Sequence, residues 1–185
     1  MRAFLAIEMS GEVRERYAAF HAESSRGHGD LRWVRPENLH LTVRFLGDTP
    51  ERKVDAIRER LEDAARAVPA FRASVGAPGA FGPRNSPQVL WFGIADGSSQ
   101  LLQLEERIDA PLSKLGFPRD GKPWHAHITV ARNPRKVRFE SWSEELARSG
   151  LPGLPLAVDS MAMYSSLTKP DGPAYTLVWS VRLKE

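Results

Sequence analysis

The four residues HLTV at positions 40–43 return almost unchanged as HITV at positions 127–130. In both copies a histidine and a threonine stand two residues apart, with an apolar residue after each. Side chains two apart on a β-strand point to the same face, about 6.6 Å from each other. Each copy therefore predicts a strand with a polar His/Thr face and an apolar face toward the core. The repeat indicates two similar halves whose polar faces line one cleft.

The alternation extends beyond the four repeated residues. In the first strand it predicts that Arg44 shares the face of His40 and Thr42. In the second strand it predicts that His125 shares the face of His127. Because only five histidines occur in the whole chain, two of them with a threonine at the same spacing are improbable by chance.

Size and composition bound the remaining possibilities. The chain has 185 residues, 42% of them hydrophobic, which suffices for one sizeable core. Because it has no cysteine, a disulfide framework, a thiolate zinc site and a cysteine nucleophile are excluded. A net charge of +3 is compatible with an anionic ligand. The apolar run at 4–7 is too short for a signal peptide, and no segment reaches the roughly 18 apolar residues of a membrane span. We therefore expect a cytoplasmic protein without a membrane partner.

Strands and helices alternate along the chain, which predicts an α+β or α/β architecture. Helices are expected behind Ser10, Asp48 and Ser99, and a short one before Gly150. Loops are expected at 21–30 and in the Gly/Pro-rich stretch at 76–87. Strands are expected at 2–9, 31–34, 39–47, 71–75, 88–95, 124–132, 156–166 and 174–183.

Two imidazoles that face each other across a cleft can act as base and acid in one reaction, since their ordinary pKa lies at about 6.5. The threonine hydroxyls add donors for anionic oxygens. Together these groups can activate water, protonate a leaving oxygen and hold the oxygens between, which is hydrolysis of a phosphate ester without a metal. A strained cyclic phosphate is the reactive substrate that such a site requires.

Several further stretches match one known family. They are RAFLAI at 2–7, LRWVRPENLHLTVRFLGD at 31–48, VLWFGI at 89–94, PWHAHITVAR at 123–132 and MYSSLTKPDGPAYTLV at 163–178. With them the sequence resembles the 2H phosphoesterases, and most closely the RNA 2′,3′-cyclic phosphodiesterases, also called 2′,5′-RNA ligases.

The resemblance implies an α+β fold in which antiparallel sheets line a central cleft and helices lie outside. It implies a single domain, 1–185, made of two closely packed lobes. It further implies hydrolysis of a terminal RNA 2′,3′-cyclic phosphate to a 2′-phosphate, by cleavage of the bond to the 3′ oxygen. No metal, no cofactor and no obligatory protein partner is expected.

The resemblance also implies roles for single residues. His40 would donate a proton to the departing 3′ oxygen, and His127 would take a proton from water. Thr42 and Thr129 would hold the nonbridging oxygens. The order of donor and acceptor comes from the resemblance alone, since a reaction run in reverse exchanges the two roles.

Four further residues are candidates for substrate binding. Arg132 matches an arginine that commonly follows the second motif of the family, but strict alternation puts it on the wrong face unless the strand twists or ends near Ala131. Arg44 is a candidate at the rim of the cleft, and Phe4 and Tyr164 are candidates for stacking on a base.

Two alternatives stay open at the level of sequence. His40, His125 and His127 could instead form a three-histidine zinc site, although this leaves both threonines unexplained. The same cleft could also serve a non-catalytic protein that binds RNA ends.

Overall fold

The structure of the chain is a computed structural model that describes residues 1–185 apart from 28, 30, 84, 120, 134–137 and 171, and leaves out the side chain of residue 141. The strands are β1 (Arg2–Glu8), β2 (Arg32–Trp33), β3 (His40–Asp48), β4 (Phe71–Phe81), β5 (Val89–Ile94), β6 (His127–Arg132), β7 (Pro155–Val158), β8 (Ser160–Lys169) and β9 (Gly172–Arg182). The helices are α1 (Gly11–Gly27), α2 (Val54–Arg66), α3 (Ser98–Lys114) and α4 (Glu140–Ala147), with short 3-10 turns η1 (Pro36–Asn38) and η2 (Glu51–Lys53).

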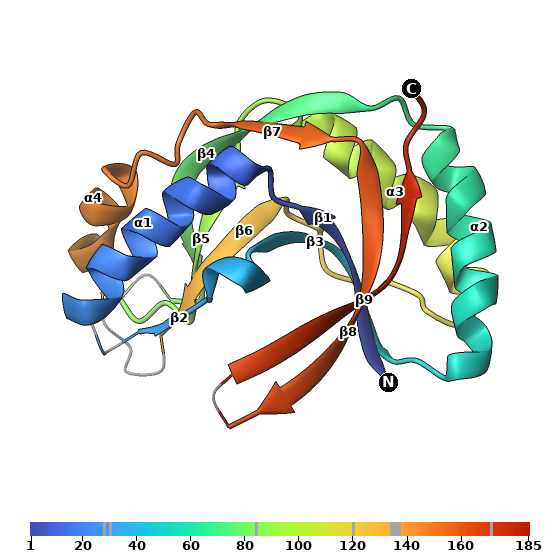
Figure 1. The fold of residues 1–185 in the computed structure, drawn as a ribbon, viewed down its shortest axis with the longest axis horizontal. Helices are drawn as coiled ribbons and strands as arrows, with labels where there is room; N and C mark the ends of the chain where they lie inside the picture. The colour runs from blue at the N-terminus through green and yellow to red at the C-terminus, as the bar shows by residue number, and fades with distance from the viewer. Residues whose placement is uncertain (28, 30, 84, 120, 134–137, 171) are drawn as a thin grey trace.

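The strands form one curled antiparallel sheet in the order β7-β4-β5-β6-β3-β1-β8-β9, with β2 added beside β6 (Figure 1). β3 and β6 meet in the middle of this order, through the register pair Leu41↔Ile128. The two halves of the sheet therefore join where the two repeated motifs begin. The predicted α+β class is confirmed, and the sheets of the two lobes are continuous with each other.

The helices cover the outer side of the sheet, and α1 and α3 each lie on the half that does not contain the strand before them. In Figure 1, α1 and α4 lie on the half with β4 and β7, while α2 and α3 lie on the half with β9. The Tyr17 hydroxyl on α1 donates to the carbonyls of Val34 (2.7 Å) and Val130 (3.0 Å), so a helix that follows β1 is fixed to β6. No helix among the described residues is long and apolar enough to cross a membrane.

Two of the predicted loops are wrong in part. α1 continues through residues 21–27, because Ser24 remains on the buried face of the helix and its hydroxyl donates to the Glu145 carboxylate (2.5 Å). β4 continues through the first half of the Gly/Pro-rich stretch, as far as Phe81. Gly79 lies flat against the Trp91 ring on β5, where any side chain would collide with the ring. Glycine is thus required in that strand by a close approach and does not mark a turn.

Candidate active site

The antiparallel pairing of β3 with β6 brings the two motifs together. Because Leu41 pairs with Ile128, one step away along the two strands His40 comes beside Thr129, and His127 comes beside Thr42. All four polar side chains are partly buried, whereas their apolar neighbours on the opposite face are fully buried. Each histidine therefore faces the threonine of the other motif across the seam of the sheet.

His40 is held in one orientation by its surroundings. Its Nδ1 lies 2.7 Å from the Asn38 carbonyl oxygen, which can only accept, so Nδ1 carries a proton and donates. Its Nε2 lies 3.0 Å from the Thr42 hydroxyl. The rings of Phe4 (4.8 Å between centroids) and Tyr175 (5.3 Å) enclose the imidazole. In the neutral ring, Nε2 is thus the acceptor, and it accepts from the Thr42 hydroxyl on the motif face.

His127 repeats this arrangement in the second half. Its Nδ1 donates to the carbonyl of His125, also at 2.7 Å and also two residues upstream. The Phe81 ring lies edge-on to the imidazole with centroids 4.8 Å apart. Both histidines therefore present Nε2 as the atom available for proton transfer.

Burial lowers the pKa of His40, which the Asn38 hydrogen bond opposes and the nearby charge of His127 reinforces. Burial likewise lowers the pKa of His127, with an opposing effect from the His125 carbonyl and a lowering effect from the His125 ring. Both rings are consequently neutral at neutral pH in the free protein. An anion bound between them would raise both pKa values, because it stabilises the charged form.

A bulge follows the motif in β3. Ala6 of β1 pairs with Thr42, but the next residue, Leu5, pairs with Arg44, so Val43 is an extra residue in the strand. The parity of the faces changes at that point, and Phe45 instead lies on the cleft side, 71% exposed.

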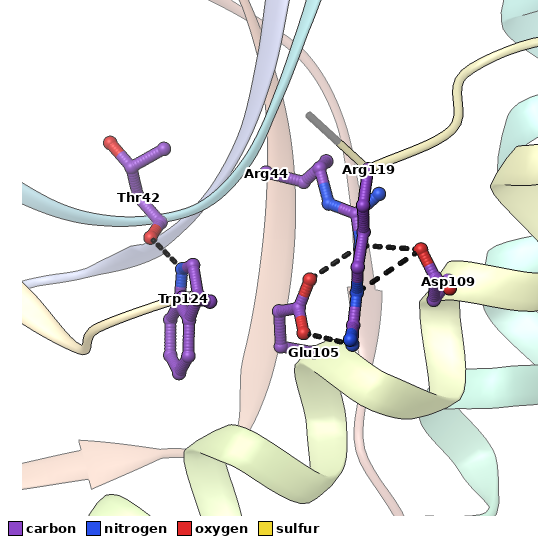
Figure 2. Close-up of polar contacts among 6 residues, drawn as sticks. All are labelled: Thr42, Arg44, Glu105, Asp109, Arg119 and Trp124. Atoms are coloured by element: carbon purple, nitrogen blue, oxygen red, sulfur yellow. Dashed lines mark hydrogen bonds and ion pairs between the residues drawn. The ribbon is translucent and has the colours of Figure 1, made fainter. Parts of the chain in front are cut away.

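Arg44 therefore lies on the opposite face from Thr42, and the prediction that they share a face is wrong. Its side chain is 8% exposed and forms ion pairs with Glu105 and with Asp109 (2.9 Å) on α3. Arg119 pairs with the same two carboxylates, with its Nε 3.2 Å from Asp109. Figure 2 shows Arg44 turned away from Thr42 toward this cluster.

A bulge at the equivalent place in β6 brings Arg132 to the motif face. Thr129 pairs with Trp91 of β5 and Ala131 with Leu90, so Val130 is the extra residue. Val130 and Ala131 are both fully buried, and Arg132 is exposed. The departure from strict alternation that Arg132 requires is thus confirmed, although its contact with substrate stays a prediction.

Phe4 and Tyr164 lie side by side in the aromatic wall next to His40. Phe4 is 3% exposed and stacks on Tyr164 (5.6 Å between centroids, 21° between planes). The Tyr164 hydroxyl donates to the Glu8 carboxylate. Burial raises the pKa of Tyr164, and the carboxylate of Glu8 raises it further, so the phenol remains protonated. Phe4 supports His40 directly, while Tyr164 keeps a partly exposed edge.

Tyr175 and Asn38 contribute to the site without having been predicted. Tyr175 contacts both Phe4 (4.9 Å between centroids) and His40. Burial raises the pKa of Tyr175, and the charge of Arg132 acts in the opposite direction. The Asn38 amide donates to the Pro173 carbonyl (2.9 Å) and so ties the β9 strand to the turn before His40. These contacts leave little trace in the sequence, because they depend on three strand pairings: β9 with β8, β8 with β1, and β1 with β3.

A pocket of about 330 Å³ adjoins the motif face and shares Thr42 and His127 with it. The Trp124 indole forms one wall, and its Nε1 donates to the Thr42 carbonyl oxygen (3.3 Å; Figure 2). Arg44, Glu105 and Arg119 line the same pocket.

The described residues, which include all three histidines of the alternative zinc site, contain no group of three or more His, Asp or Glu side chains arranged to hold a metal ion. His125 is exposed and lies with its ring centroid 6.4 Å from that of His127. The alternative three-histidine zinc site therefore has no ligand cluster in the described part of the chain.

Comparisons with known proteins agree with this geometry. A profile of the 2′-5′ RNA ligase superfamily matches residues 12–170. The chain is 33% identical to an RNA 2′,3′-cyclic phosphodiesterase of Thermotoga maritima (100% of this chain, 96% of the relative) and 34% identical to one of Archaeoglobus fulgidus (95% and 96%). The crystal structure of TT0787 of Thermus thermophilus superposes with a TM-score of 0.82 at 29% identity (100% and 98%). The chain thus belongs to the 2′-5′ RNA ligase superfamily, within the 2H phosphoesterases that its two motifs resemble.

Proposed function

We propose that this protein hydrolyses RNA 2′,3′-cyclic phosphate ends to 2′-phosphates by acid–base catalysis with two histidines and no metal. The observation that carries the proposal is the pair Leu41↔Ile128, because it sets two equally oriented imidazoles at the seam of one sheet. The names of the relatives from Thermotoga maritima and Archaeoglobus fulgidus support the substrate class.

In the proposed reaction His127 is the base. Its neutral Nε2 takes a proton from water as the water oxygen attacks phosphorus. The bond between phosphorus and the 3′ oxygen breaks on the other side, and the His40 imidazolium gives its Nε2 proton to that oxygen. The anionic substrate raises the pKa of both rings, but a charge on one ring lowers the pKa of the other, so in this proposal His40 carries the proton while His127 stays neutral. The hydroxyls of Thr42 and Thr129 donate to the nonbridging oxygens.

The remaining contacts would hold the RNA end on the His40 side. Arg132 offers an exposed guanidinium near Tyr175 for phosphate, and the edges of Tyr164 and Tyr175 offer apolar surface for the terminal nucleoside. Phe4 and Arg44 would act from beneath, Phe4 against the His40 ring and Arg44 by pairing with Glu105. With a 5′-hydroxyl in place of water, the same steps would give 2′,5′-ligation.

The experiment uses a short RNA that ends in a 2′,3′-cyclic phosphate, incubated with the protein in excess chelator. We expect full turnover to the 2′-phosphate isomer only. Binding without turnover would favour the RNA-end binder instead. A 3′-phosphate product, or activity lost in chelator and restored by zinc, would contradict the proposed mechanism.

A further inference from the structure

The pocket next to the motif face is asymmetric with respect to the two histidines. Thr42 and His127 line it, whereas His40 does not. A molecule bound there would reach the reacting phosphorus from the His127 side. In the proposed function this is the side from which the nucleophile attacks. A ligand in the pocket could therefore supply a nucleophile other than water.

The walls of the pocket are fixed by polar contacts before any ligand arrives. The Trp124 indole is tied to the Thr42 carbonyl oxygen, and Arg119 is tied to Glu105 and Asp109 of α3 (Figure 2). Glu105 is 1% exposed, and Arg44 reinforces it from β3. A preformed pocket loses less conformational freedom on binding, which favours affinity.

The chemistry of the lining suits a nucleoside. Phe45 lies at the pocket with 71% of its surface exposed, and Trp124 adds a second aromatic ring. The Arg119 side chain is 39% exposed, so part of its guanidinium remains accessible beside the carboxylates. Aromatic rings and arginine guanidinium planes are the surfaces on which unpaired bases stack. The volume of about 330 Å³ lies at the lower end for small-molecule pockets.

We propose that this pocket binds the 5′-terminal nucleoside of a second RNA, whose 5′-hydroxyl then attacks the cyclic phosphate in place of water. The inference rests on the proposed function and names the acceptor site for its ligation reaction. His127 takes the proton of the 5′-hydroxyl, the bond between phosphorus and the 5′ oxygen forms, and the bond to the 3′ oxygen breaks. His40 protonates the 3′ oxygen, and the product is a 2′,5′-phosphodiester with a free 3′-hydroxyl.

The test measures both products in one reaction. A saturating RNA with a 2′,3′-cyclic phosphate end is mixed with increasing amounts of a short RNA that has a 5′-hydroxyl and a blocked 3′ end. If the acceptor occupies the pocket, the rate of 2′,5′-linked product saturates with acceptor concentration, and hydrolysis falls in parallel. An acceptor whose first residue is abasic should reach the same transfer rate only at an about tenfold higher concentration.

Phe45→Ala should lower the transfer rate at limiting acceptor by about tenfold. Leu102→Ala removes an exposed apolar side chain from α3 outside the pocket and should leave the rate as it is. Three results would overturn the acceptor pocket without affecting the proposed hydrolysis. They are a transfer rate that stays linear in acceptor concentration, an equal rate with the abasic acceptor, and hydrolysis without any transfer. If the wild-type protein forms neither the ligated nor the hydrolysed product, the proposed function itself is refuted.

Discussion

The two motif strands are alike in backbone and unlike in surroundings. β3 and β6 both begin at the histidine, share one pattern of burial over their first six residues and carry a bulge just after the threonine. In both, the carbonyl two residues upstream fixes the imidazole. The backbone of the site is thus duplicated down to the atom that orients each ring.

The differences begin with the neighbours of each ring. His40 lies between Phe4 and Tyr175, whereas His127 has the exposed His125 next to it. After the bulge, β3 exposes Phe45, and β6 exposes Arg132. In the proposed mechanism, the symmetric pair of strands would supply the two proton transfers, and the asymmetric neighbours would decide which ring acts as acid and what binds on each side.

Removal of either imidazole should have the largest effect. His40→Ala and His127→Ala should each lower kcat by between about 10²- and 10⁴-fold, because each abolishes one proton transfer. A cyclic substrate with sulfur in place of the 3′ oxygen separates the roles, since a thiolate leaves without protonation. This substrate should restore much of the rate of His40→Ala and little of that of His127→Ala. Equal restoration of both variants would contradict the assignment of acid and base.

Arg44 occupies the position just after the bulge of β3, where the side chains of the two motif strands differ most. β6 carries Ala131 there, whereas β3 carries a buried arginine paired with Glu105 and Asp109. Arg44→Ala should lower the free energy of unfolding by about 3 kcal/mol, since it leaves a buried carboxylate with one partner fewer. Arg148→Ala, in an exposed pair with Glu144, is the matched control and should change little. Equal midpoints of urea unfolding would show that the buried network adds no stability.

The two threonines are the part of the repeat that would contact the phosphate. Thr42→Val and Thr129→Val should each lower kcat on the order of 10²-fold, because each removes one donor to an oxygen that gains charge. Thr→Ser at the same positions keeps the hydroxyl and should retain most activity. If the valine variants raise KM and leave kcat unchanged, the hydroxyls contribute to substrate binding, and their proposed stabilisation of the transition state is wrong.

His125 gives the smallest expected effect, in the pH dependence. Its ring lowers the pKa of His127, so His125→Ala should raise that pKa. A base must be neutral, and therefore the acid limb of kcat/KM should move to higher pH in the variant. The limb that reports His40 should move less, because burial is the main cause of its lowered pKa and His125 is not among the causes. A shift of the alkaline limb alone would assign the base to the other ring.

The sequence predicted the parts of the site that depend on local alternation. The polar faces that carry His40 and His127 follow from period-2 alternation in each strand, and the helix over Val54–Arg66 follows from one apolar stripe. The two bulges were not predictable in position, since an extra residue is defined only against the register of a neighbouring strand. That is why the predicted face of Arg44 was wrong, whereas Arg132 lies on the face that its proposed role requires.

Contacts between distant segments were also beyond local reasoning. Tyr175 reaches His40 only because β9 pairs with β8, and β8 with β1. β3 and β6 pair only through Leu41 and Ile128, and the Trp124 indole donates to the carbonyl oxygen of Thr42, the next residue of β3. Neither contact leaves a periodic trace in the sequence.

The central claim is that both imidazoles act on the same phosphorus. The most direct measurement is an NMR titration of the two ring signals in the free protein and with a bound 2′-nucleotide. The pKa of both His40 and His127 should lie below about 6.5 in the free protein and rise together on binding, because one phosphate stabilises both charged rings. A rise for one ring only, with the other unchanged at saturation, would contradict the account.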